Sequence, residues 1–295
     1  MSRPPDAATP DPRVAAAFRR RRIGVGVALV VFLGGLGAAG VTGWRWYTAP
    51  TCQATASGST FAFSPEQTQN AATIAAVAIK RGLAARAITI ALATALQESD
   101  LRNIDYGDRD SVGLFQQRPS QGWGSAEQIL DPVYSAGAFY DELIKVDNYA
   151  ERPITEVAQA VQRSAYPSAY ADHEQQGRAL ASTLAGHSPA GLACRLADPA
   201  TPGDARALSA DLRAQLGEVA TTQEADGGTR VIVHTSSSTR AWTVAEWAMA
   251  QADGRGITTI DVADRRWTRG SGRGALTWAS TSAEASGTTV VITID

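Results

Sequence analysis

The sequence predicts a mainly α-helical domain, preceded by one transmembrane helix and followed by a small α+β domain. Three observations predict this arrangement. An uncharged apolar run lies near the N-terminus, the middle of the chain places apolar residues at helical spacing, and short strand-like runs follow a Pro-containing segment near residue 200. The chain has 295 residues, which is enough for two ordinary domains.

Composition narrows the class of protein. Hydrophobic residues make up 44% and charged residues 19%, a balance that permits buried cores and excludes a chain disordered throughout. Residues 1–22 hold six Arg and two Asp, so this tail carries +4, and the formal net charge of −2 leaves −6 for the remainder. We therefore expect no nucleic-acid partner. The two Cys and three His show no ligand-like spacing, which predicts no metal site and no cofactor.

The apolar run covers residues 23–43 and contains no charge. As a helix it spans roughly 30 Å, the thickness of the hydrocarbon core of a bilayer. Four Arg precede it at 19–22, and Trp44 follows it, so the positive-inside rule predicts a cytoplasmic tail over 1–22 and a single-pass cell-membrane protein. The alternatives are a cleaved signal peptide and, less favoured, lipid attachment at Cys52. In each case residues 48–295 lie outside the cytoplasm.

Cys52 and Cys194 are then in an oxidising compartment, and they flank a long helical region. The simplest prediction is one disulfide between them, the alternative being two unpaired thiols. Closing so long a loop contributes at most about 5 kcal/mol in the chain-entropy treatment.

The helical domain is expected over 52–194. Ser64, Pro65 and Gln67 read as an N-cap, a first-turn proline and a capping-box partner, which open a helix that Gly82 closes. The run from Ala84 to Ser99 is almost all Ala, Ile, Leu and Thr, so it predicts a buried central helix. Further helices are expected near 125–146, 153–164 and 168–185, with a polar, Gly-containing loop over 101–124.

A linker is predicted over 195–204, where two prolines occur and apolar residues are few. Residues 205–295 then form the small α+β domain. An amphipathic helix carries Leu208, Leu212 and Leu216, a strand follows at 230–235, a helix at 241–252, and several strand-like runs lie towards the C-terminus. No motif in this domain indicates a chemistry.

Gln97, Glu98 and Ser99 are the polar residues that follow the apolar run of the central helix, and Glu98 is the ionisable one among them. Burial beside apolar residues and the negative end of its own helix both disfavour the carboxylate, so we expect a raised pKa, as a general acid requires. The alternative is a helix-terminal Glu that faces water or caps a neighbouring backbone.

The context of Glu98 favours the first interpretation. Glu98 and Ser99 are followed, after a short loop, by Ser111-Val112-Gly113-Leu114-Phe115-Gln116-Gln117. These residues resemble the soluble lytic transglycosylase and goose-type lysozyme family, and the resemblance covers roughly residues 64–185. It implies a helical lysozyme-like fold, a peptidoglycan glycan strand as substrate, Glu98 as the catalytic acid, and Ser99 as a residue that supports the acid or binds the substrate. It also implies a cleft lined by Gly113, Leu114, Phe115 and Gln116, with Phe115 where the family has Met.

The chain departs from the family in its later tyrosine motif. The counterpart is the stretch 160–167, in which Tyr166 is expected to supply the tyrosine, with Tyr170 close by as the alternative. Gln116 and Gln117 carry amides suited to N-acetyl and hydroxyl groups, and Trp123, between two glycines, offers a ring face to a sugar or else covers the loop as a core residue.

Together these features predict a membrane-anchored peptidoglycan glycosidase that cleaves the bond between N-acetylmuramic acid and N-acetylglucosamine with one Glu as acid and base. The alternative is a non-catalytic peptidoglycan-binding or cell-envelope scaffold protein. The expected partners are glycan strands, the membrane through the N-terminal helix, and a cell-envelope protein through residues 205–295.

Overall fold

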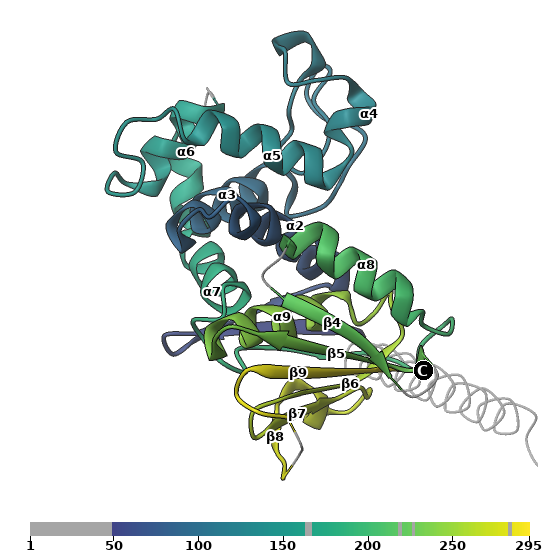
Figure 1. The fold of residues 1–295 in the computed structure, drawn as a ribbon. Coiled ribbons are helices and arrows are strands. Elements are labelled where there is room, and N and C mark those ends of the chain that lie inside the picture. Colours follow the sequence, from purple (N-terminus) through teal and green to yellow (C-terminus); the bar gives the residue numbers. More distant parts are fainter. Residues whose placement is uncertain (1–48, 163–166, 218–219, 226–227, 283–284) are drawn as a thin grey trace, which may run out of the picture. The chain divides into compact units, whose positions relative to one another are not determined.

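The structure is a computed structural model that describes residues 49–162, 167–217, 220–225, 228–282 and 285–295. Residues Pro50–Asp295 form one compact unit. In the described residues this unit contains eight α-helices and two antiparallel sheets, one of three strands in the order β2-β1-β3 and one of six in the order β4-β5-β9-β6-β7-β8 (Figure 1).

The predicted fold class is therefore wrong. The predicted helical region contains a sheet, and none of the helices in the described part of the chain has the length and apolar character to cross a bilayer. The predicted tail 1–22 and the predicted span 23–43 lie outside the described residues.

The unexpected sheet is built from segments next to the two cysteines. Its strands are β1 (Thr51–Ala56), β2 (Ser59–Phe63) and β3 (Leu192–Arg195). Every second residue of β1 is buried, which is the period of a strand, and the turn to β2 uses Ser57 and Gly58, both at positive φ. Cys52 and Cys194 face each other in the β1–β3 register and form a disulfide.

The helices of the first half are α2 (Pro65–Lys80), α3 (Ala85–Ser99), α4 (Ala126–Ile129), α5 (Pro132–Leu143), α6 (Ile154–Gln162) and α7 (Glu174–Leu184), with 3-10 turns η1 (Pro119–Gln121) and η2 (Pro167–His173). The predicted capping box opens α2, with Ser64 Oγ accepting from Gln67 N. Helix α3 is buried from Ala87 to Leu96, because it packs against α2, α5, α6 and α7.

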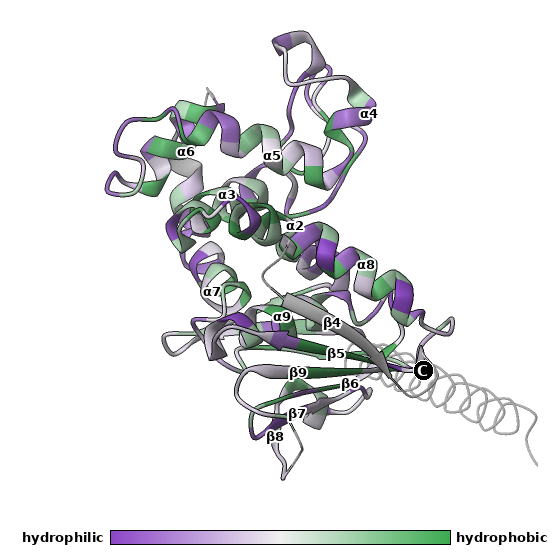
Figure 2. Ribbon diagram, viewed as in Figure 1, coloured by the Kyte–Doolittle hydropathy of each residue, from purple (hydrophilic) through white to green (hydrophobic). Residues whose placement is uncertain are grey.

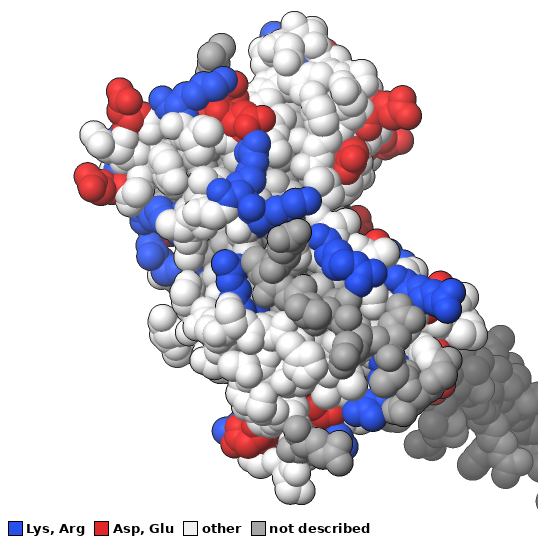
Figure 3. Space-filling model, viewed as in Figure 1, with Lys and Arg blue, Asp and Glu red and all other residues white. Residues whose placement is uncertain are grey.

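The second half contains α8 (Ala205–Leu216), β4 (Ala220–Ala225), β5 (Arg230–Thr235), α9 (Ser238–Gln251), β6 (Ile257–Val262), β7 (Arg265–Thr268), η5 (Arg273–Leu276), β8 (Ala279–Ser280) and β9 (Thr289–Ile294). Helix α9 packs on β5, β6 and β9, whose buried residues include Val233, Ile260 and Ile292. These strands carry hydrophobic residues in Figure 2. Charged side chains of both signs are scattered over the face in Figure 3.

The predicted linker lies against the second half. Leu196 N donates to Gly270 O at 3.0 Å, and Gly203 N donates to Asp295 O at 2.8 Å. Gly203 is so close to the last strand that a Cβ there would lie against the side chain of Ile294. The division into domains at 195–204 stays a prediction, and one hydrophobic core includes residues from both sides of it.

Candidate active site around Glu98

The carboxyl group of Glu98 is half-buried in the last turn of α3. The hydroxyl of Tyr170, a buried residue of η2, donates to Glu98 Oε1 at 2.6 Å. Burial raises the pKa of Glu98, and hydrogen bonds from the side chains of Tyr170 and Gln162 lower it by less, so the pKa lies above its usual value. The site thus combines a carboxyl that retains its proton more readily than usual with two donors that stabilise the anion once the proton leaves.

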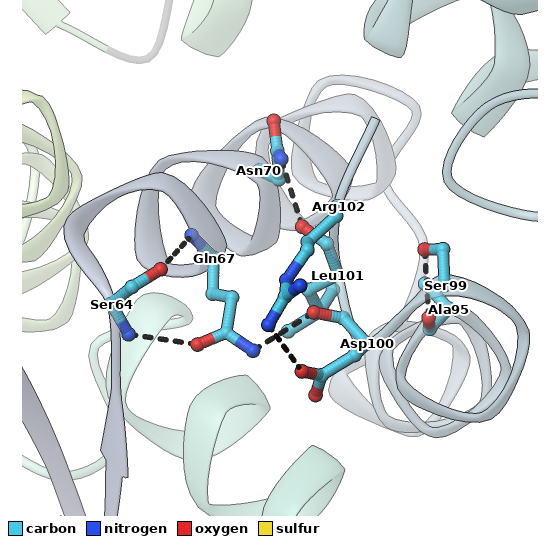
Figure 4. A network of polar contacts seen from close by, with 8 residues as sticks. All are labelled: Ser64, Gln67, Asn70, Ala95, Ser99, Asp100, Leu101 and Arg102. Atoms are coloured by element: carbon cyan, nitrogen blue, oxygen red, sulfur yellow. Dashed lines mark hydrogen bonds and ion pairs between the residues drawn. The ribbon is translucent and has the colours of Figure 1, made fainter. Parts of the chain in front are cut away.

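The end of α3 is held in place by α2, as Figure 4 shows. Asp100 and Leu101 both take left-handed backbone conformations, with φ of 55° and 57°. Their carbonyl oxygens accept hydrogen bonds from Gln67 Nε2 at 2.9 Å and Asn70 Nδ2 at 2.8 Å. These bonds satisfy carbonyl groups that leave the helical pattern, and they anchor the turn that carries Glu98.

Two side chains, one of them a hydrogen-bond donor to Glu98, bind the backbone of the predicted 113–116 segment. The hydroxyl of Ser99 donates to Leu114 O at 2.8 Å. Gln162 Nε2 donates to Phe115 O at 2.7 Å, and the same side chain hydrogen bonds to Glu98. The backbone carbonyls of this segment therefore position Ser99, which follows the acid, and Gln162, which donates to the acid.

The shape of this segment depends on Gly113, whose φ is +78°. Its N–H donates to Ile104 O at 2.7 Å, and a Cβ at this position would lie 2.7 Å from the carbonyl oxygen of Ile129. Val112 and Gln117 close the loop by exchanging backbone hydrogen bonds of 3.0 and 3.1 Å. Only glycine fits here without a shift of the neighbouring backbone.

Most side chains expected to line a cleft point elsewhere. Leu114 and Phe115 are fully buried, and the Phe115 ring stacks on Phe139 with 4.6 Å between centroids. Gln117 is buried too, and its Nε2 donates to Ser135 O at 3.1 Å. Gln116 Nε2 donates to Tyr106 O and Gly113 O, so its amide stays within its own loop.

Trp123 lies at a pocket of ≈ 370 Å³. The pocket is lined by Gln121, Gly122, Trp123, Glu142, Val161 and Gln162. Gln162 lines this pocket and also hydrogen bonds to the Glu98 carboxyl. The pocket is therefore one side chain away from the acid. Trp123 is half-buried and packs against the core, as expected of a residue that covers the loop. It also lines the pocket, as expected of a ring that a sugar contacts.

The sequence did not single out Gln121, Glu142 or Gln162. A sequence signal for Gln162 existed, because this residue lies in the stretch 160–167 that was compared with the family's tyrosine motif. Tyr166 lies outside the described residues, and Tyr170, the alternative, donates to Glu98.

Asp110, an acidic residue of the 101–124 loop, has structural partners. Arg118 Nε lies 2.8 Å from Asp110 Oδ1, and Ser120 N donates to Asp110 Oδ2 at 2.8 Å. These bonds hold the pKa of Asp110 well below its usual value. In the described ranges no group of three or more His, Cys, Asp and Glu is arranged to hold a metal ion.

No protein-family model matches the chain, and no curated protein matches its sequence.

Proposed function

We propose that the protein is a peptidoglycan glycosidase in which Glu98 protonates the glycosidic oxygen between N-acetylmuramic acid and N-acetylglucosamine. The observation that carries this proposal is the half-buried Glu98 carboxyl, which has a raised pKa, bonds to Tyr170 and Gln162, and lies one side chain from a pocket. A raised pKa of this kind is what a general acid requires.

The surroundings of the carboxyl suit both halves of the reaction. Burial favours the protonated form before the bond breaks, and the donors stabilise the carboxylate that remains afterwards. That carboxylate then accepts a proton from the attacking group. If the group is the muramyl 6-hydroxyl, the product has an anhydro end, and if it is water, the product has a reducing end.

The groups that line the pocket suit a sugar. Trp123 supplies an aromatic face, and Gln121 and Gln162 supply amide donors and acceptors for hydroxyl and N-acetyl groups. Glu142 also lines the pocket, but its Oε1 lies 2.6 Å from Lys145 Nζ and its side chain is 39% exposed. The carboxyl with the environment of an acid is therefore Glu98, and a single such group favours the intramolecular route.

Action outside the cytoplasm is part of the proposal. The Cys52–Cys194 disulfide supports it, because such bonds persist mainly in oxidising compartments. Anchoring in the cell membrane through residues 23–43 stays a prediction, as does the resemblance of residues 64–185 to the transglycosylase and lysozyme family.

The test is incubation of the full chain with purified peptidoglycan, followed by mass spectrometry of the soluble fraction. We expect the wild type to release muropeptides. Glu98→Gln keeps the shape of the side chain and removes the acid, so it should release at least a hundredfold fewer. Glu127→Gln, at an exposed Glu of α4, should give an undiminished yield. Release that persists in Glu98→Gln refutes the assignment. Sedimentation with the wall without release by the wild type favours the non-catalytic binding protein.

A further inference from the structure

A second pocket, of ≈ 290 Å³, lies where the α2–α3 turn, the end of α7 and the start of α9 meet. Its apolar wall comes from Ile79, Leu83 and Ile88 together with small Ala side chains, and Ile88 is fully buried. Its polar groups come from His187, Ser237, Thr239, Arg240 and Thr243. None of these residues belongs to the site around Glu98.

The lining carries one permanent positive charge. It includes Arg240 but no Asp or Glu. Arg240 is a partly buried residue, and within the described part of the chain its side chain makes no hydrogen bond or ion pair. In contrast, Arg266 pairs with Asp261, and Arg269 donates to Ala252 O and Ile257 O. An anion can therefore bind the Arg240 guanidinium without displacing a protein partner.

Neighbouring hydroxyls extend this polar side. Ser237 Oγ accepts from Arg240 N at 3.2 Å, which leaves its own hydrogen free to donate. Thr243 Oγ1 already donates to Thr239 O at 3.0 Å. A carboxylate at this position would thus meet the planar fork of one arginine and the hydroxyl of one serine.

We propose that this pocket binds an aliphatic monocarboxylate, with the carboxylate on Arg240 and the alkyl chain along Ile79 and Leu83. At roughly 30 Å³ for each non-hydrogen atom, the volume accommodates about ten such atoms. Octanoate has that size and serves as the probe. The bidentate guanidinium contact selects the charge, and the apolar wall selects the chain.

Isothermal titration calorimetry of the full chain tests the proposal. We expect saturable 1:1 binding of octanoate, no binding of octylamine, which has the same chain and the opposite charge, and at least tenfold weaker binding of inorganic phosphate. Arg240→Gln should weaken octanoate binding about tenfold or more, whereas Arg265→Gln, in the six-stranded sheet, should leave it unchanged.

A filling variant tests the location separately from the charge. Ala85→Leu adds three carbons to the wall of the pocket and should abolish octanoate binding, with thermal unfolding used to confirm that both variants fold. Glu98→Gln should bind octanoate like the wild type, so failure of the proposed glycosidase activity would not affect this result. The proposal is overturned if the wild type shows no saturable octanoate binding, if octylamine binds equally well, or if folded Arg240→Gln or Ala85→Leu binds octanoate like the wild type.

Discussion

The Tyr170 hydroxyl is expected to control the acidity of Glu98, and Tyr170→Phe removes that hydroxyl with little change in shape. In the wild type it donates to Glu98 Oε1 at 2.6 Å, a distance typical of a hydrogen bond from a hydroxyl to a carboxylate. Such a bond stabilises the anion more than the neutral acid. Its loss should therefore raise the pKa of Glu98 further.

The size of the effect follows from the geometry. A hydrogen bond to a charged group contributes about 1.5–3 kcal/mol, and 1.36 kcal/mol corresponds to a factor of ten in an ionisation equilibrium. We expect the acid dissociation constant of Glu98 to fall by roughly a factor of ten or more. Because a general acid must be protonated, the alkaline limb of the pH–rate profile should move to higher pH.

Two measurements check this expectation. NMR titration of ¹³C-labelled Glu carboxyls gives the pKa directly, with the Glu98 signal assigned from its absence in Glu98→Gln. The pH dependence of muropeptide release gives the kinetic counterpart. The control is Tyr140→Phe, which removes the hydroxyl of another buried tyrosine that donates to Ile74 O at 3.1 Å. It should lower stability without changing the pKa of Glu98. An unchanged or lowered pKa in Tyr170→Phe refutes the reasoning.

Three further predictions concern stability. Gly113→Ala should lower the free energy of unfolding by about 3 kcal/mol in urea titrations, and Gly122→Ala by about 1 kcal/mol. Both glycines have positive φ, but only a Cβ at Gly113 would meet a backbone carbonyl, so equal losses would contradict this reasoning. Glu246 is fully buried, and burial raises its pKa well above 4.5, so its contribution to stability is present below that pH and is lost as the pH rises. Glu246→Gln should therefore raise the unfolding temperature at pH 7, and this temperature should fall less between pH 5 and 7 than it does in the wild type. A variant that unfolds at a lower temperature than the wild type at pH 7 would refute this. Replacing both Cys52 and Cys194 by Ser should lower the free energy of unfolding by about 2–5 kcal/mol, and the reduced wild type should show the same urea midpoint as this variant. A variant midpoint equal to that of the oxidised wild type would show that the disulfide contributes little.

Several elements were predictable because their signals are local. The Ser64 capping box, the buried helix that ends at Ser99 and the helices at 205–216 and 238–251 all follow from the spacing of apolar residues and from caps a few positions away. The cysteine pairing was predicted from compartment and count alone.

The sheet around the disulfide was missed for a physical reason. Strands β1 and β3 are six and four residues long and are separated by more than 130 residues, so neither is stable or recognisable until the other is beside it. The same holds for the common core across 195–204, where Trp267 donates to the backbone of Cys194.

At the candidate site, the sequence by itself determined that an ionisable group ends an apolar helix and that a Gly-centred loop follows it. Only the tertiary structure decided which groups surround that carboxyl. Phe115 and Leu114 turn inward because their apolar side chains are stabilised by burial, and this leaves their backbone carbonyls to bind Ser99 and Gln162. Tyr170 reaches Glu98 from 72 residues away, and no local pattern encodes a contact made by the packing of η2 on α3.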